Sequence, residues 1–117
     1  MKACVIIPTL NEEKNIYKIF NKIKSTKIKL DILFIDDNSK DASQNIIKNL
    51  KKKFKYVMYI FRNSKTGIGS AHKEGIKYCY KKKYDLIITI FNSIFMGRSY
   101  TNFIMPKNIF NIFKFFF

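Results

Sequence analysis

Residues 32 to 39 have the sequence Ile-Leu-Phe-Ile-Asp-Asp-Asn-Ser, an apolar run that ends abruptly in polar residues. Short, continuous apolar runs are typical of strands that are buried on both faces of a parallel sheet. The polar residues that follow favour a turn or the start of a helix. This stretch therefore predicts a buried strand of an α/β sheet, followed by a polar loop at its carboxyl end.

Three further continuous apolar runs occur in the chain, and in the segments between them apolar residues recur at helical spacing. The runs are Ala3–Ile7, Val57–Phe61 and Leu86–Ile90. Runs that begin about 25 to 30 residues apart match successive strand-plus-helix units. We therefore predict an α/β fold with a mostly parallel, doubly wound sheet of about four strands and right-handed crossovers.

Three helices are expected between these strands. Asn11 is expected to cap the first, whose apolar positions Ile16 and Phe20 recur at helical spacing. The second is expected to begin near Asp41, and the third to present Gly75 on its apolar face.

The composition allows a folded core and favours anionic partners. The chain has 117 residues, an apolar share of 47% and a net charge of +15. Nucleic acid, an acidic membrane leaflet and a phosphorylated substrate all fit such a charge, as do lysines that merely solvate helix faces. The lysines are not interleaved with aromatic residues, so we expect no nucleic acid partner and leave membrane-surface association open.

The two cysteines and the hydropathy profile carry little further information. Cys4 and Cys79 have no metal-ligand or redox spacing, which favours a reduced, cytosolic environment. We find no signal peptide and no apolar run of the roughly 18 residues that a membrane span needs.

The character of the sequence changes after residue 90. No Asp or Glu follows Asp85, and phenylalanine becomes frequent. We therefore divide the chain into a folded part, residues 1–90, and a divergent Phe-rich tail, residues 91–117. The alternatives for its last stretch, residues 108–117, are packing on the sheet, resting in a membrane interface, aggregation, or no evolved role at all.

Polar residues follow the first three predicted strands, where ligands bind in open parallel sheets. The groups are Thr9, Asn11 and Glu12; Asp36, Asp37, Ser39 and Asp41; and Arg62, Ser64, Lys65 and Thr66. The acidic group suits hydrogen bonds from a nucleoside, and helix capping is the alternative. No G-x-G-x-x-G motif follows the first strand, which argues against NAD and FAD.

A loop with two glycines precedes the third predicted helix. Gly67 and Gly69 lie just after Arg62 and Lys65, so backbone amides and cations could meet a phosphate there, although an ordinary turn explains the glycines equally well. His72 has no partner motif and is expected to be structural.

Together these motifs resemble family 2 glycosyltransferases, in particular the dolichol-phosphate mannosyltransferase subfamily. The matching stretches are Pro8–Glu12 (P-T-L-N-E), Asp36–Asp41 (D-D-N-S-K-D) and Lys65–Ala71 (K-T-G-I-G-S-A). The resemblance covers residues 3 to 90. It implies the nucleotide-sugar-binding half of a GT-A (Rossmann-like) domain, truncated after about four strands. It also implies transfer of mannose from GDP-mannose to dolichyl phosphate, on the cytosolic face of the endoplasmic reticulum membrane.

The resemblance also implies a set of nucleotide-sugar-binding residues, and no catalytic residue is assigned. The set is Pro8, Leu10, Glu12, Ile35, Asp36, Asp37 and Lys65. The family often has tyrosine where this chain has Leu10, so contact with the base is expected to be weaker here. Ile35 is expected to contribute backbone atoms.

The family's metal motif is missing from the sequence. Relatives carry Asp-x-Asp after the fourth strand to hold Mg²⁺ or Mn²⁺, whereas this chain has Ile90-Phe91-Asn92-Ser93. A neutral amide and a hydroxyl are poor substitutes for two carboxylates, so no divalent cation is expected to bind tightly. We therefore expect no efficient transfer by this chain alone. The alternatives are a non-catalytic fragment that binds a nucleotide sugar, or a basic protein that binds RNA or a membrane surface.

Overall fold

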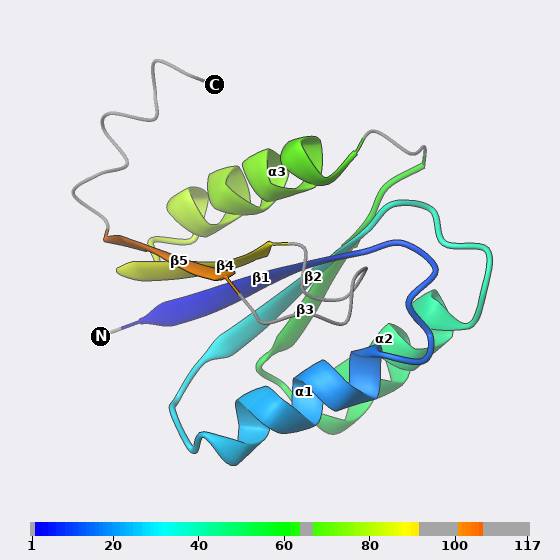
Figure 1. Ribbon diagram of the computed structural model, residues 1–117. Coiled ribbons are helices and arrows are strands. Elements are labelled where there is room, and N and C mark those ends of the chain that lie inside the picture. Colours follow the sequence, from blue (N-terminus) through cyan, green and yellow to red (C-terminus); the bar gives the residue numbers. More distant parts are fainter. Residues whose placement is uncertain (1, 64–66, 92–100, 107–117) are drawn as a thin grey trace.

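The computed structural model describes residues 2–63, 67–91 and 101–106, which form a single sheet with helices on both faces (Figure 1). The elements in chain order are β1 (Ala3–Thr9), α1 (Ile16–Ser25), β2 (Asp31–Asp36), α2 (Ser43–Lys53), β3 (Val57–Phe61), α3 (Ile68–Lys81), β4 (Leu86–Phe91) and β5 (Thr101–Pro106). The strand order in the sheet is β3-β2-β1-β4-β5.

The predicted α/β fold with a mostly parallel sheet is confirmed. β1 pairs in parallel with β2 and β4, and β2 pairs in parallel with β3. The sequence did not predict β5, which lies within the expected tail and pairs antiparallel with β4, with Phe91 opposite Thr101 and Leu86 opposite Pro106. The rest of the expected tail, residues 92–100 and 107–117, lies outside the described part of the chain.

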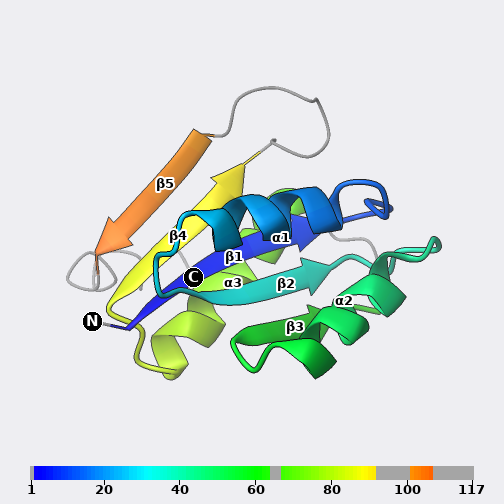
Figure 2. The same ribbon diagram turned by 90° about the horizontal axis from the view of Figure 1, so that it is seen from below.

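The order in which successive strands are placed in the sheet explains which face each helix covers. The chain first adds β2 and β3 on one side of β1, and then returns to place β4 on the other side. Because each crossover is right-handed, a connection that leads to the other side of β1 places its helix on the opposite face of the sheet. Accordingly, α1 and α2 lie together on one face and α3 lies on the other (Figures 1 and 2).

Two apolar cores follow from the alternation of side chains along the central strands. Val5 and Ile7 of β1 and Phe34 of β2 are buried on the face that α1 and α2 cover. Their neighbours Ile6 and Leu33 are buried on the opposite face, under α3. Both central strands are therefore buried on two faces, which is why they appear in the sequence as continuous apolar runs.

Gly75 lets α3 approach the sheet closely. A Cβ atom added at this position would lie 2.7 Å from both Ile35 Cδ1 and Ile6 Cγ2. A larger residue would push the helix away from β1 and β2 or force their side chains out of their rotamers. The glycine thus sets the thickness of this layer.

The two cysteines are free thiols buried in the same core. A hydrogen bond with the Cys79 thiol, together with burial, raises the pKa of Cys4 well above its ordinary value. Both side chains therefore belong to the apolar packing.

None of the helices in the described part of the chain combines the length and the apolar character that crossing a membrane requires.

His72 makes the stability of the fold depend on pH. The side chain is 4% exposed near the start of α3, and burial lowers its pKa from 6.5 to about 4. Between these values the unfolded chain binds more protons than the folded chain, so stability is lost as the pH falls from 6.5 towards 4. We expect the free energy of unfolding to drop by about 2 kcal/mol between pH 7 and pH 5.

Urea denaturation of the wild type and of His72→Gln at both pH values tests this prediction. The variant should lose most of the pH dependence, whatever its stability at pH 7. Equal slopes in the two proteins would contradict the assignment to His72.

Candidate functional site

The carboxyl ends of β1, β2 and β3 meet at one edge of the sheet, which we call the carboxyl edge. The loops there are residues 10–15 after β1, residues 37–42 after β2 and residues 62–67 after β3, of which 64–66 are outside the description. The order of the strands reverses beside β1, and ligands of doubly wound sheets bind at such a point.

Asp36 ends β2 and is completely buried, with 0% exposure. Its Oδ1 accepts hydrogen bonds from Thr9 Oγ1 at 2.7 Å and from Ser39 Oγ at 2.5 Å. Its Oδ2 accepts from Ser39 N at 2.8 Å and from Gln44 Nε2 at 2.9 Å. A carboxylate has about four acceptor positions, so these contacts fill them. Asp36 therefore fixes the end of β1 and the first turn of α2 relative to β2.

Side chains also connect the loop after β1 to the loop after β2. Ser39 Oγ accepts a hydrogen bond from Asn11 N at 2.8 Å, and Asn11 Oδ1 accepts from Lys40 N at 2.8 Å. Ser43 Oγ accepts from Glu12 N at 2.8 Å. These bonds satisfy backbone amides that have no partner within a helix or strand. The two loops are thus held together as one polar platform.

The expected role of Asn11 as a helix cap is wrong. Helix α1 begins later, at Ile16, and Asn15 occupies the N-cap position. Asn11 instead adopts a left-handed conformation with a φ of 52°, which asparagine tolerates better than most residues. This conformation accompanies its hydrogen bonds to the neighbouring loop.

Asp37 and Arg62 form a buried ion pair beside the start of α3. Arg62 Nε and Nη2 both contact Asp37 Oδ1, and Asp37 Oδ2 accepts a hydrogen bond from Gly67 N at 3.1 Å. The guanidinium also donates to Gly67 O at 3.1 Å, Ser70 Oγ at 2.8 Å and Glu74 Oε2 at 3.4 Å. The hydrogen bond with Asp37 raises the pKa of Arg62, which keeps its charge. Arg62 therefore pairs with carboxylates, and the phosphate contact expected for it has no support in this geometry.

Glu12 is a second buried carboxyl group at this edge. Its exposure is 6%, and its Oε2 accepts a hydrogen bond from Asn15 Nδ2 at 2.8 Å. Burial raises the pKa of Glu12, the bond from Asn15 lowers it, and the charge of Asp41 raises it further, with a net upward shift. Glu12 thus holds a proton more readily than an exposed glutamate.

Of the other proposed nucleotide-sugar-binding residues, Pro8, Leu10 and Ile35 also lie at or near the carboxyl edge. Pro8 and Ile35 are register partners on β1 and β2, both buried, and Leu10 is half-buried at the start of the first loop. The side chain of Ile35 is buried in the core under α3. Lys65 lies outside the described residues.

Sequence reasoning did not find the residues that support the acidic group. Gln44 and Ser43 were absent from the predicted set, although the predicted helix near Asp41 would place both at its start. The pairing of Asp37 with Arg62 joins residues 25 positions apart and leaves no pattern in the sequence.

The described residues do not fit a divalent cation. No group of three or more His, Cys, Asp or Glu side chains able to hold a metal ion occurs among them. Asp36 has its acceptor positions filled, and Asp37 is paired with a guanidinium group. The residues that replace Asp-x-Asp, Asn92 and Ser93, are not described.

The sheet order and the polar platform define a doubly wound α/β domain with its ligand-binding edge at the carboxyl ends of the strands. The chain belongs to glycosyl transferase family 2, whose model matches residues 4–93. An uncharacterized protein of Methanocaldococcus jannaschii is 39% identical over 87 residues, which cover 73% of this chain and 37% of that protein. The dolichol-phosphate mannosyltransferase of Pyrococcus furiosus is 34% identical over 79 residues, or 66% of this chain and 22% of that enzyme.

Solved structures show the same GT-A fold. A mannosyltransferase of Pyrobaculum calidifontis, in complex with GDP-Man and Mn²⁺, matches with a TM-score of 0.66 and 15% identity, covering 74% of this chain and 26% of that one. Residues 1–349 of TarS from S. aureus, in complex with UDP, match with a TM-score of 0.65 and 22% identity, covering 76% and 26%. The chain thus spans well under half the length of these proteins and of the curated relatives.

Proposed function

We propose that this chain is the donor-binding part of a mannosyltransferase and that its carboxyl edge binds GDP-mannose. In the whole protein, mannose would pass to dolichyl phosphate, at the cytosolic face of the endoplasmic reticulum membrane. Membership of the family and the names of several relatives, which are polyprenol- or dolichol-phosphate mannosyltransferases, support this proposal.

The observation that carries the proposal is the rigid polar platform at the carboxyl edge. Asp36 ties β1, β2 and α2 together, and Asp37 lies beside it in a second network. A site that is already ordered loses little entropy when a ligand binds. The proposed contacts to the nucleotide are Pro8, Leu10, Glu12, Ile35, Asp36, Asp37 and Lys65. Since Asp36 has filled its acceptor positions within the chain, Asp37 and the backbone around Ile35 are the better candidates for the nucleoside.

The described chain is proposed to bind the donor without transferring the sugar. In this family a divalent cation, when bound, neutralises charge that develops on the leaving diphosphate. The described residues offer no set of carboxylates for it. Binding of the nucleotide sugar should therefore be independent of Mn²⁺ or Mg²⁺.

Leu10→Tyr tests the pocket through a gain of affinity, which a folding defect cannot imitate. Leu10 is half-buried, so a larger ring can be placed without disturbing the core. We expect about tenfold tighter binding of GDP-mannose, since stacking of a base on an aromatic ring contributes about 1 to 3 kcal/mol. Calorimetric titration with GDP-mannose, GDP and UDP-glucose measures the effect.

Leu10→Ala is the matched control and should bind no more tightly than the wild type. Addition of Mn²⁺ should leave all three affinities unchanged. Failure of the folded wild type and of Leu10→Tyr to bind any of the three nucleotides would refute the proposed pocket, and a preference for UDP-glucose would refute the choice of donor.

A further inference from the structure

The outer side of β3 has no neighbouring strand in the described part of the chain, where β3 ends the sheet (Figure 2). The backbone N–H and C=O groups of successive residues point alternately to the two sides of a strand. Arg62 N, at the end of β3, donates to Asp36 O of β2 at 2.8 Å. The groups of Tyr59 and Phe61 therefore point away from β2. We call this outward-facing row of backbone groups the free edge of β3.

The sequence of β3 lacks the features that usually protect such an edge. Edge strands are commonly protected by proline, by charged side chains or by a bulge. The five residues of β3, Val-Met-Tyr-Ile-Phe, include neither proline nor a charged residue. Tyr59 is 38% exposed, and Met58, Ile60 and Phe61 are half-buried. Backbone groups that accept a further strand thus lie beside accessible apolar side chains.

On the face that α2 covers, the free edge is bordered by aromatic rings and lysines. The rings of Tyr59 and Phe61 stack with their centroids 4.3 Å apart, and Lys48 Nζ lies 5.7 Å from the centroid of Phe61. Lys52 follows Lys48 by one helical turn, so the two lie on the same side of α2, and both are exposed. Positive charge therefore runs alongside the aromatic pair.

On the face that α3 covers, the same edge is apolar. Met58 and Ile60 pack against the core under α3 and remain half-buried. Tyr78 Oη lies 3.4 Å from Met58 Sδ and extends this surface onto the helix. A strand added to the free edge would therefore meet cations on one face of the sheet and apolar groups on the other.

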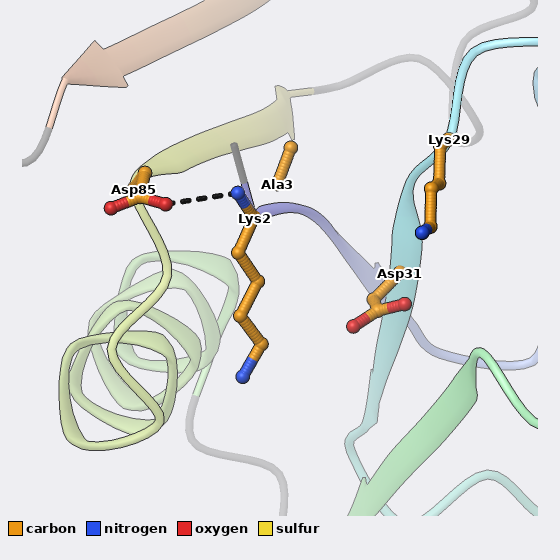
Figure 3. Close-up of a pocket in the computed structure, with 5 residues that line it drawn as sticks. All are labelled: Lys2, Ala3, Lys29, Asp31 and Asp85. Carbon is orange, nitrogen blue, oxygen red and sulfur yellow. Dashed lines mark hydrogen bonds between the residues drawn. The ribbon is translucent and has the colours of Figure 1, made fainter.

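The excess of positive charge beside β3 is local. The cavity of about 520 Å³ at the start of the strands is lined by lysines and aspartates in equal number, namely Lys2, Lys29, Asp31 and Asp85, together with Ala3 (Figure 3). Its charges are thus balanced, and Lys2 N donates to Asp85 Oδ2 at 2.9 Å. In contrast, no acidic residue occurs in the sequence between Asp41 and Glu74, the segment that contains α2 and β3.

We propose that the free edge of β3 binds an extended acidic segment of another protein as an additional strand. Because side chains alternate between the two faces of a strand, the best segment alternates acidic and apolar residues. Its carboxylates would lie beside Lys48 and Lys52. Its apolar side chains would lie beside Met58 and Ile60, while its backbone pairs with the outward-facing groups of Tyr59.

A second copy of this chain fits the free edge less well. Antiparallel pairing of two β3 strands across a two-fold axis would place both α2 helices on the same face of the joined sheet. Lys48 and Lys52 of each copy would then lie near the junction. Like charges repel there, and each chain carries a net charge of +15. The lysines thus oppose pairing between copies and favour an acidic partner.

This inference goes beyond the proposed function and does not depend on it. The free edge runs along the side of the sheet, whereas the candidate site lies at the carboxyl ends of the strands. An added strand therefore leaves the carboxyl edge open to the donor and the acceptor proposed above. The experiments below use no nucleotide, so their outcome is separate from that of the donor titration.

Fluorescence anisotropy with labelled peptides tests strand addition to the full chain. The probe is Glu-Val-Glu-Val-Glu-Val-Glu. One control is the same peptide with methylated backbone nitrogens, which keeps the charge and the side chains but cannot donate backbone hydrogen bonds. The other is Glu-Glu-Val-Val-Val-Glu-Glu, which keeps the composition without the alternation. We expect the probe to bind at least about tenfold more tightly than either control.

Two double variants of equal charge test the role of α2. Lys48→Gln with Lys52→Gln should weaken binding of the probe about tenfold, because it removes two exposed ion pairs. Lys14→Gln with Lys18→Gln is the control, since both lysines are exposed near the start of α1. This control should bind the probe as the wild type does.

Amide hydrogen exchange, followed by nuclear magnetic resonance, locates the bound peptide. The amides of Tyr59 and Phe61 face away from β2, so the probe should slow their exchange at least about tenfold. The amides of Met58 and Ile60 face β2 and serve as the internal control. Their exchange should change much less.

Four outcomes would overturn the proposal. Absence of binding of the probe to the folded wild type would remove the site. Equal affinity for the probe and the methylated peptide would reduce the effect to net charge. Equal losses in the two lysine variants would exclude a role for α2. Self-association of the wild type that Tyr59→Pro abolishes would assign the free edge to a second copy.

Discussion

Asp36→Ala is expected to lower the free energy of unfolding by about 4 kcal/mol, the largest effect of any single substitution considered for this chain. The substitution removes the acceptor of four hydrogen bonds and leaves the donors of Thr9, Ser39 and Gln44 without their partner. Each donor left unsatisfied in a buried position costs about 1 to 3 kcal/mol. Urea denaturation followed by circular dichroism measures the loss.

Asp31→Ala provides the control on the same strand. Asp31 begins β2, as Asp36 ends it, and its carboxylate accepts a hydrogen bond from Tyr84. Its loss should cost about 1 kcal/mol. If the two substitutions lower the free energy of unfolding equally, the four hydrogen bonds of Asp36 are not the main contacts that hold the carboxyl edge together.

The second large effect concerns the buried ion pair of Asp37 and Arg62. The side chains are 7% and 9% exposed, so removing one partner leaves a charge in a poorly solvated place. We expect Arg62→Met alone and Asp37→Asn alone to cost about 3 kcal/mol each. The double variant should cost about 2 kcal/mol less than the sum of the two, because it leaves neither charge unpaired. A double-mutant cycle of urea denaturation curves measures this coupling.

Glu74→Gln tests whether burial is the cause. Glu74 also pairs with Arg62, at 3.4 Å, but its side chain is 44% exposed. Exposed ion pairs contribute between about 0 and 1 kcal/mol, so this variant should remain close to the wild type. A loss as large as that of Asp37→Asn would show that Arg62 depends on its total number of carboxylate partners.

The strands and the layers could be predicted from the sequence because a strand that is buried on two faces appears in it as a continuous apolar run. Ala3–Ile7 and Ile32–Ile35 are continuous apolar runs, and each became a central strand. The sequence of β5 contains no such continuous apolar run. It is a strand at the edge of the sheet in the described residues, and its stretch, Thr-Asn-Phe-Ile-Met-Pro, mixes polar and apolar residues without a clear period.

The edge that carries the candidate site could be predicted, but the roles of its residues could not. Parallel strands bring their carboxyl ends together, which places Thr9, Asp36 and Arg62 near one another from topology alone. Asp36 and Asp37 are identical and adjacent in sequence, yet one is held by neutral donors and the other by a guanidinium group. That difference depends on contacts across loops, and local patterns do not encode such contacts.

The position of β1 in the middle of the sheet has a consequence for synthesis on the ribosome. One side of β1 pairs with β2, which follows soon in the chain, but its other side waits for β4, and the bond from Lys2 to Asp85 joins residues 83 positions apart. At about 5 to 20 residues per second, translation of that interval takes on the order of ten seconds. Throughout it, the nascent chain presents an apolar strand with one open edge, which is the kind of segment that chaperones protect.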